Sequence, residues 1–457
     1  MHLLLIAYDF PPVPSPQSLR WAYLVRELSL AGHTVEVIAP DIPDNGPGGL
    51  PSLPKEVAVH RVDPGRFSRL LRGRARRDTS SVDAPVNTTG LIRAPAGISS
   101  LNWKGRLRRR LEASLGLGGG LNWKGVLAEK AKSIVSNQVF PDYRVEWVGP
   151  AIEVLEAVVA KRRPDAVIAS HEPACSLPVG LAAAKRGLLL VVDMGDPVLA
   201  PYTPEKWRMQ AGALERSVCD AAVMISVTTE SAARTLKLRH MIPEDKVHVM
   251  PQGFDPGFIM LPQDQMLDFD ESILELLYTG SFYSFRRAEE VLSAVRSVPG
   301  VRLTVATVSA PDYLIMAAES APQSIRLVGF MPHRGALAAQ RCCDVLVNLA
   351  NADPVQVPGK VFEYLGAGKP ILHLRGELRD ATGEMLMSMG AGWDMVSEQA
   401  SIKQALQEMK DLKRAGKLGQ RAVDADNAVA YAWPQLARSW SAHLCTIIGQ
   451  RIAEVAP

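Results

Sequence analysis

Short apolar runs alternate with segments of helical periodicity along almost the whole chain, and this alternation constrains the fold more than any other feature. It is typical of α/β proteins, in which helices join parallel strands and cover the faces of the sheet. We expect strands at residues 2–8, 33–39, 166–170, 188–192, 222–227, 247–250, 274–279, 301–307, 325–329, 345–349 and 371–374. Helices are expected at residues 18–31, 150–162, 358–367 and 433–452, with another beginning near 288 and further helices towards the C-terminus.

The length of 457 residues indicates more than one domain, because a single core rarely grows that large. The turn-rich segment Pro251–Pro256 separates two parts of the chain, and each part shows the same alternation of strands and helices. We therefore expect two doubly wound, Rossmann-like domains, residues 1–255 and 256–432, facing a central cleft. Residues 433–457 are expected to form a helix that crosses back to the first domain. Ligands of such sheets bind at the carboxyl ends of the strands.

A basic segment interrupts the first predicted domain. Residues 61–110 contain thirteen Lys or Arg and three Asp or Glu, inside an insertion that we place at about 45–140. Apolar residues and Trp103 accompany the basic ones, as in segments that bind an anionic membrane surface. Nucleic acid binding and a solvated loop are the alternatives, although we expect no nucleic acid partner because no recognised motif accompanies the charge. The sequence Leu-Asn-Trp-Lys-Gly occurs at 101–105 and again at 121–125, with no assigned role.

Composition excludes several other classes. The chain is 47% hydrophobic and 22% charged, with a net charge of +3, which is ordinary for a globular protein and not for a disordered one. No run approaches the roughly 18 apolar residues of a membrane span. The five cysteines form no CxxC pair, so we expect no disulfide framework, no zinc site and a cytoplasmic location, with possible peripheral attachment to the inner membrane.

The first candidate site is the segment Val357–Pro370, which follows a predicted strand and opens a helix. Pro358 and Gly359 at the helix start leave free backbone N–H groups that suit a phosphate. Lys360 and Glu363 lie three residues apart on one helical face, and a carboxylate there can accept two hydroxyl groups of a ribose. The alternative is a surface ion pair between these two side chains.

Two further segments end predicted strands. Gly280 and Ser281 follow strand 274–279, and the arginines Arg286 and Arg287 at the next helix entry can clamp a diphosphate. His171 follows strand 166–170 and can hydrogen-bond a sugar or move a proton, unless it is a structural histidine. Asp193 and Asp196 end strand 188–192, as acceptor contacts or helix caps.

Several motifs resemble those of the retaining family 4 glycosyltransferases of the GT-B fold. Val357–Leu372 is similar to the nucleotide-sugar block VPxKxxEYxAxGKPIL, and Tyr278–Arg287 to the donor-diphosphate loop YTGxFYxxR. Weaker resemblances lie in residues 8–12 with Arg20 and Gly32-His33, and in residues 192–197, 249–255, 325–332 and 344–349. The resemblance covers nearly the whole chain outside residues 45–140.

The resemblance implies transfer of a sugar from a UDP- or GDP-linked donor to a glycan or lipid-linked acceptor, with retention, in cell-surface polysaccharide biosynthesis. No metal or other cofactor is implied, because the leaving diphosphate itself accepts the acceptor's proton. The candidate residues are His171, Arg286 and Glu363 as catalytic residues; Gly280, Ser281, Arg286, Arg287, Gly359, Lys360 and Glu363 for the donor; and Asp9, Arg20, Asp193 and Asp196 for the acceptor.

The sequence also departs from the family pattern. Many members carry a second glutamate eight residues before the one at Glu363, where this chain has Val355; Asp353 is a possible substitute. Ser281 replaces an arginine and Gln252 an asparagine. These changes keep two alternatives open: a nucleotide-sugar epimerase of the same fold, and a GT-B-like protein that binds a nucleotide sugar without turnover.

Overall fold

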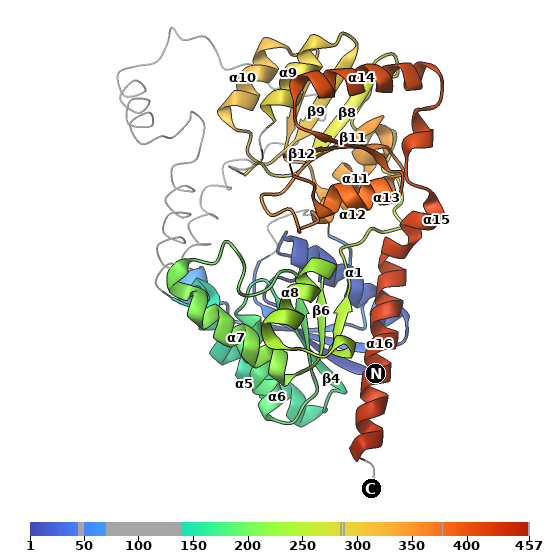
Figure 1. The fold of residues 1–457 in the computed structure, drawn as a ribbon. Helices are drawn as coiled ribbons and strands as arrows, with labels where there is room; N and C mark the ends of the chain where they lie inside the picture. The colour runs from blue at the N-terminus through green and yellow to red at the C-terminus, as the bar shows by residue number, and fades with distance from the viewer. Residues whose placement is uncertain (44–49, 70–138, 284–285, 287, 377, 456–457) are drawn as a thin grey trace. The chain divides into compact units, whose positions relative to one another are not determined.

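The computed structural model describes residues 1–43, 50–69, 139–283, 286, 288–376 and 378–455, and the side chains up to residue 450. The chain divides into two compact units, one of residues 1–63 and 148–457 and the other of residues 64–147. The first unit contains two separate sheets, which we treat as its first half and second half (Figure 1). Most of the basic segment, and both copies of the repeated pentapeptide, lie outside the described residues.

The first half is built on a seven-stranded parallel sheet in the order β3-β2-β1-β4-β5-β6-β7. Its strands are β1 (His2–Ile6), β2 (Thr34–Pro40), β3 (Ala58–Val62), β4 (Ala166–His171), β5 (Leu190–Met194), β6 (Ala222–Val227) and β7 (Val247–Val249). Its helices are α1 (Pro16–Leu30), α5 (Val148–Lys161), α6 (Ser176–Lys185), α7 (Arg208–Ala221) and α8 (Glu230–His240). Every residue of β1 and β4 is buried, as expected for strands covered on both faces.

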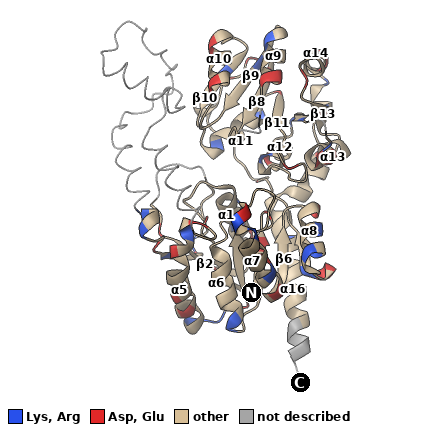
Figure 2. Ribbon diagram, turned by 60° about the vertical axis from the view of Figure 1, so that its left-hand side comes forward, with Lys and Arg blue, Asp and Glu red and all other residues tan. Residues whose placement is uncertain are grey.

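The second half repeats this architecture with a six-stranded parallel sheet in the order β10-β9-β8-β11-β12-β13. Its strands are β8 (Leu274–Thr279), β9 (Val301–Ala306), β10 (Ile325–Gly329), β11 (Val345–Leu349), β12 (Ile371–Arg375) and β13 (Gly392–Val396). Its helices are α9 (Glu289–Ser297), α10 (Asp312–Ser320), α11 (His333–Cys342), α12 (Gly359–Ala367), α13 (Ala381–Ser388), α14 (Gln399–Arg414) and α15 (Ala425–Ala428). Charged residues lie mostly on helices and loops, and the strands are largely uncharged (Figure 2).

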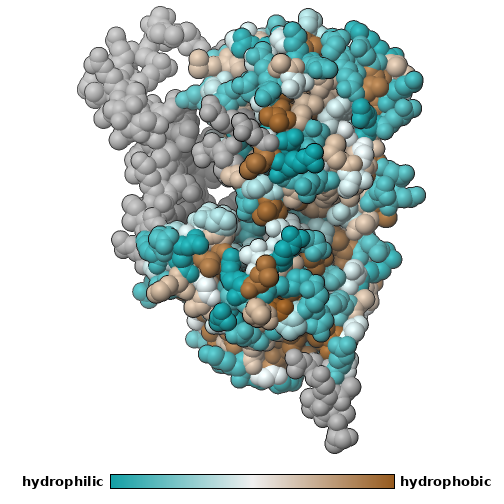
Figure 3. Space-filling view, in the orientation of Figure 1, coloured by the Kyte–Doolittle hydropathy of each residue, from teal (hydrophilic) through white to brown (hydrophobic). Residues whose placement is uncertain are grey.

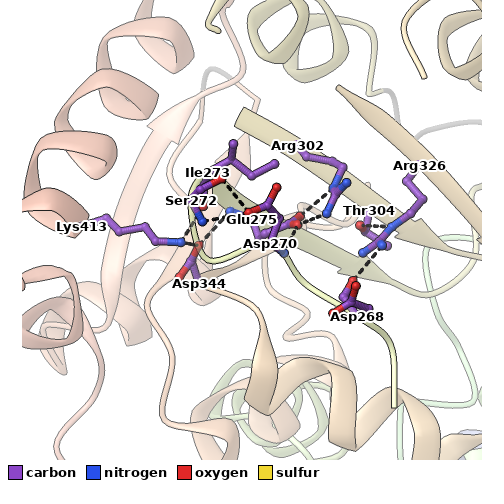
Figure 4. Close-up of polar contacts among 10 residues, drawn as sticks. All are labelled: Asp268, Asp270, Ser272, Ile273, Glu275, Arg302, Thr304, Arg326, Asp344 and Lys413. Atoms are coloured by element: carbon purple, nitrogen blue, oxygen red, sulfur yellow. Dashed lines mark hydrogen bonds and ion pairs between the residues drawn. The ribbon is translucent and has the colours of Figure 1, made fainter. Parts of the chain in front are cut away.

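An ionic network closes the amino edge of the second sheet (Figure 4). Glu275, only 1% exposed, receives a bidentate contact from Arg302 and accepts a hydrogen bond from the backbone of Asp270. Lys413 at the end of α14 donates to Asp344, and Asp344 accepts from the backbone N–H of Glu275. These contacts satisfy polar groups at the strand starts, which would otherwise be buried without partners. We therefore assign this network to stability rather than to a site.

The C-terminal helix α16 (Trp433–Val455) packs on α1 of the first half. The Trp21 and Trp440 rings meet edge to face with centroids 6.4 Å apart, and Tyr23 stacks on Trp433 at 5.6 Å. Trp440 Nε1 also donates to Ser226 Oγ on β6 at 2.7 Å. Large buried aromatic pairs contribute more than their buried area alone, so α16 is part of the core of the first half.

The predicted strands are confirmed to within two residues at nearly every end, and each of the eleven corresponds to a strand of the structure. Sequence reasoning missed β3 and β13, which are the two edge strands next to β2 and β12. Both carry polar residues and β3 is half exposed, so neither has the continuous apolar run of the central strands. The boundary placed at residue 255 falls between β7 and β8, and the predicted domain limits stay predictions.

Within the described residues, no helix has the length and apolar character that crossing a membrane requires. On the face drawn in Figure 3, apolar residues form small separate groups among polar ones. All five cysteines are free. In the smaller unit, the described residues include a 3-10 helix, Tyr143–Trp147, in which Tyr143 packs against Phe67 with ring centroids 5.8 Å apart.

Candidate functional site

The site begins where the strand order of the second sheet reverses, between β8 and β11. The crossovers from these neighbouring strands run to opposite sides, which opens a crevice at their carboxyl ends. Gly280 follows β8 with φ +133°, a backbone conformation that residues with a Cβ rarely adopt. Ala350 and Asn351 follow β11 at the same edge. The structure therefore places Gly280, Ser281 and Asn351 at the carboxyl edge where the strand order reverses.

Lys360 reaches this edge from the first turn of α12. Pro358 is the N-cap of that helix and Gly359 its first residue, as predicted. Lys360 Nζ donates to the carbonyl oxygen of Thr279 at 3.3 Å and lies 3.8 Å from the centroid of the Tyr278 ring. Burial holds the pKa of Lys360 well below its usual range, and the nearby charge of Arg286 adds to this lowering.

Arg286 supplies a second cation to the same edge. Its Nη1 donates to the carbonyl oxygen of Ser281 at 3.2 Å, its Nη2 donates to Asn351 Oδ1, and its guanidinium lies 5.1 Å from the Tyr283 ring centroid. Glu363 partly offsets the repulsion between these two cations, and an anion held beside them would offset it further. Arg287, the other predicted arginine, lies outside the described residues.

Glu363 lies one turn after Lys360 on α12, but the two side chains form no ion pair with each other in the described structure. Glu363 Oε1 is 2.8 Å from His333 Nε2, and Glu363 Oε2 accepts from Gln340 Nε2 at 3.5 Å. The surface ion pair considered from the sequence is therefore wrong. Sequence reasoning missed His333, Gln340 and Asn351, because only the tertiary fold brings them to α12 and β8.

The loop before α12 carries the departures from the family pattern. Val355 is 42% exposed, and its backbone N–H donates to Asp353 Oδ1 at 3.1 Å. The Asp353 carboxylate thus closes a turn of its own loop, as aspartates commonly do. Asp353 remains only a candidate for replacing the carboxylate that Val355 lacks.

His171 is the last residue of β4, at the carboxyl edge of the first sheet. Its side chain is 7% exposed, and Nδ1 makes no hydrogen bond to any residue that the structure describes. Burial lowers the pKa of His171 to about 4, so its ring is neutral at pH 7. A neutral imidazole can donate one hydrogen bond to a ligand and accept another, but it cannot stabilise a negative charge as a cation would.

Arg20 and Asp193, two acceptor-side candidates, are bound to each other. Arg20 Nε and Nη2 each donate to an Asp193 carboxylate oxygen at 3.0 Å, and both side chains are fully buried. Arg20 also donates to the carbonyl oxygens of Met250 and Pro251 at 2.8 Å. The pair ties α1 to β5 and to the end of β7, and this structural role accounts for both residues.

Asp196 and Asp9 lie in the loops that follow β5 and β1, at the same carboxyl edge as His171. Tyr202 donates to Asp196 Oδ2 at 2.9 Å and approaches Glu172 Oε1 at 3.4 Å. Burial raises the pKa of Asp196. Glu172 has φ +69°, a strained conformation for a residue with a side chain, which is common at functional edges. Asp196 is partly exposed at this edge, whereas Asp193 is fully buried against Arg20.

Comparison with known families finds a match within the first half. Residues 130–253 match the family model of the glycosyl transferase 4-like domain. This segment is similar to that domain. It contains β4 to β7 and the candidates His171, Asp193 and Asp196. The block that carried the strongest resemblance, 357–372, lies outside the matched range. No curated protein matches the sequence.

Solved structures extend the likeness to the whole chain. A sucrose-phosphate synthase from Thermosynechococcus elongatus superposes with a TM-score of 0.64 at 12% identity, over 98% of this chain and all of that one. Anabaena HepE in complex with UDP-glucose gives 0.55 at 10% identity, over 98% and 100%. A Listeria monocytogenes protein assigned as a UDP-N-acetylglucosamine 2-epimerase gives 0.56 at 11%, over 97% and 96%. The chain has the GT-B fold of two doubly wound domains, as predicted.

Among its described residues, the chain presents no group of three or more His, Cys, Asp or Glu arranged to hold a metal ion. The side chains gathered at the edge of the second sheet are instead cationic and hydrogen-bonding. Lys360, Arg286 and the start of α12 suit an anion, and Glu363 suits hydroxyl groups.

Proposed function

We propose that the protein is a glycosyltransferase that moves a sugar from a nucleotide-diphosphate donor to a glycan or lipid-linked acceptor. The observation that carries the proposal is the convergence of Lys360 and Arg286 beside Gly280, with Glu363 one helical turn away. A nucleoside diphosphate carries both groups that this arrangement suits: a diphosphate for the two cations and a ribose diol for the carboxylate. The UDP-glucose held by the structurally similar HepE supports a UDP-linked donor, with a GDP-linked one as the alternative.

The donor site is assigned residue by residue. Lys360 and Arg286 contact the diphosphate, aided by Arg287, Ser281, the Gly280 turn and the N–H groups at Gly359. Glu363 accepts the ribose hydroxyl groups. On the acceptor side, His171 and Asp196 hydrogen-bond the reacting sugars, and Asp9 borders them, at the carboxyl edge of the first sheet. No step requires a metal, because protein cations neutralise the charge on the leaving group.

The reaction that we propose proceeds with retention. The bond between the sugar C1 and the diphosphate oxygen breaks while the acceptor hydroxyl attacks C1 from the same face. The hydroxyl proton passes to the departing diphosphate oxygen, so no protein base is needed. Lys360 and Arg286 stabilise the charge that develops on that oxygen, and placement of the reactants supplies the rest of the rate enhancement.

The test is a transfer assay with sugar-labelled UDP- and GDP-sugars and a polyprenyl-phosphate-linked glycan as acceptor. The expected result is label in the product, with the anomeric configuration of the donor as read by NMR. Arg286→Ala and Glu363→Ala should each remove transfer while leaving the thermal unfolding temperature close to that of the wild type. Label transfer that survives both substitutions would contradict the assignment.

An epimerase is the second candidate, supported by the likeness to the Listeria protein. Epimerisation at C2 breaks a C–H bond, so an epimerase incorporates deuterium from D2O into a UDP-N-acetylhexosamine without an acceptor. A transferase does not. The third candidate, a binder without turnover, would bind the nucleotide tightly and yield neither product; the missing carboxylate at Val355 motivates it.

We also propose that the basic segment attaches the protein to the cytoplasmic face of an anionic membrane, where a lipid-linked acceptor would be found. Thirteen basic residues between 61 and 110 support this docking. Arg61 already donates to Pro11 and Pro40 beside β3, so the test variant should leave β3 intact. The variant R106E/R108E/R109E/R110E should lose binding to vesicles that contain phosphatidylglycerol, and salt should weaken wild-type binding. Unchanged vesicle binding would contradict the proposal.

A further inference from the structure

We infer that His333 and Gln340 are positioning residues that orient the Glu363 carboxylate towards the donor's ribose. The inference rests on the proposed function, because it takes Glu363 as the ribose contact. Neither residue belongs to the motifs that identified the site, and both come from α11. The hydrogen-bond chain Thr279–Gln340–Glu363–His333 carries the argument.

His333 fixes one oxygen of the carboxylate. His333 Nε2 lies 2.8 Å from Glu363 Oε1, and the two side chains are only 16% and 14% exposed. An ionised carboxylate only accepts hydrogen bonds, so Nε2 must carry the hydrogen in either protonation state of the ring. His333 is the first residue of α11, directly after the N-cap Pro332, so its backbone is set by the start of that helix.

Gln340 fixes the other oxygen. It lies seven residues after His333, two turns further along the same face of α11. Its Nε2 donates to Thr279 Oγ1 at 3.3 Å and approaches Glu363 Oε2 at 3.5 Å. The reversed amide would set its oxygen against the carboxylate, so this orientation is the only favourable one.

The environment of Gln340 favours a positioning role over a stabilising one. Its side chain is fully buried, and Oε1 makes no hydrogen bond with any described residue. A buried acceptor without a partner costs stability, so a leucine of similar size would suit the core of this helix at least as well. The feature that a leucine would lack is the N–H group that holds Glu363 and Thr279.

The arrangement leaves Glu363 able to bind a diol. A carboxylate has about four acceptor positions, and His333 and Gln340 occupy one on each oxygen. One position on each oxygen remains, which matches the two adjacent hydroxyl groups of a ribose. The same chain ends at Thr279, whose carbonyl oxygen accepts from Lys360, so it joins the ribose contact to the diphosphate contact.

The experiment compares ribonucleotides with 2′-deoxyribonucleotides by isothermal titration of the full chain with UDP, dUDP, GDP and dGDP. The wild type should bind one ribonucleotide about tenfold or more tightly than its deoxy form, from the loss of one hydrogen bond to a charged group. His333→Leu should weaken binding of that ribonucleotide by about the same factor and weaken the deoxy form less, because the deoxy form has only the 3′-hydroxyl contact with Glu363 to lose. His333→Gln, which keeps an N–H donor, should restore most of the discrimination.

Gln340→Leu should also weaken binding of the ribonucleotide more than binding of its deoxy form. Its unfolding temperature should be equal to or above that of the wild type. The matched control is His240→Leu. His240 Nε2 lies 2.7 Å from Glu215 Oε1 in the first half, a similar histidine–glutamate contact away from the site. The control should lower the unfolding temperature and leave the preference for ribose unchanged.

Three outcomes distinguish a failure of this inference from a failure of the proposed function. If the wild type binds one ribonucleotide with the expected preference, and His333→Leu and Gln340→Leu retain it, the inference alone is overturned. If the variants weaken ribo and deoxy forms equally, the residues support the fold and not the ribose contact, and the inference is again overturned. If the wild type binds none of the four nucleotides, the donor site itself is wrong and the inference is overturned with it.

Discussion

Lys360 Nζ lies 3.8 Å from the centroid of the Tyr278 ring and 3.3 Å from the carbonyl oxygen of Thr279. The amine thus contacts the face of an aromatic ring and donates to this carbonyl oxygen. Burial and the charge of Arg286 both disfavour the charged form of the amine. Such a lysine is costly in the free protein and becomes favourable when an anion arrives. This relationship between stability and binding leads to the first two predictions.

Lys360→Met should separate stability from binding. Methionine fills a similar volume without a buried charge, so the free energy of unfolding should stay equal or rise by about 1 kcal/mol. The affinity for UDP or GDP should fall by on the order of 2 kcal/mol, or roughly thirtyfold, because a charge-assisted contact is lost. Lys403→Met, at an exposed position of α14, is the control and should change neither quantity. Denaturant unfolding and titration calorimetry measure the two effects.

Nucleotide affinity should depend on pH through Lys360. The free protein holds the pKa of Lys360 well below its usual range, and a bound diphosphate should raise that pKa again. Binding therefore takes up a proton at any pH between the two values, and affinity falls as pH rises through this window. Calorimetry in buffers of different ionisation enthalpy would show the proton uptake. Lys360→Met should bind weakly with no uptake from this residue, and an uptake equal to that of the wild type would contradict the account.

The Arg20–Asp193 pair should be a stability element. Arg20→Leu leaves the fully buried Asp193 carboxylate without its bidentate partner, which should cost about 3–5 kcal/mol of unfolding free energy. The double variant Arg20→Leu/Asp193→Leu should recover much of that loss, because no unpaired charge remains. A double variant as unstable as the single one would show that the charge pair is not the cause.

His171 should make the protein sensitive to acid. The pKa of its ring is about 4 in the folded state, against an ordinary value near 6.5 in the unfolded chain. Between these values the unfolded state binds more protons, so the free energy of unfolding falls as pH drops from about 6.5 towards 4, by up to about 3 kcal/mol. His171→Gln should remove this part of the pH dependence. Parallel curves for wild type and variant would contradict a buried neutral histidine.

Most of the fold was predictable because the central strands are buried on both faces. In strands such as β1 and β8 every residue is buried and most residues are apolar, as expected for central strands of a parallel sheet. The edge strands β3 and β13 were not predictable from the same signal, because they include polar residues. Their place follows from hydrogen bonding to β2 and β12, which is a property of the assembled sheet.

The candidate site was predictable where a helix start or a strand end supplied the chemistry locally. Gly280 and Lys360 belong to this class, since a glycine after a strand and a lysine in a first helical turn are visible in the sequence. The partners of Glu363 were not, because His333 and Gln340 reach it only after α11 packs beside α12. The contact between Arg20 and Asp193 was also not predictable, since α1 and β5 bring these two acceptor-side candidates together only in the folded chain.

The central claim is that the second half binds a nucleotide diphosphate through Lys360, Arg286 and Glu363. The most direct measurement is calorimetric titration of the wild type and Glu363→Ala with UDP and GDP. The account predicts saturable one-to-one binding of at least one of them by the wild type, and a loss of at least tenfold in the variant. Equal affinities in the two proteins, or no binding of either nucleotide by a folded wild type, would contradict the claim.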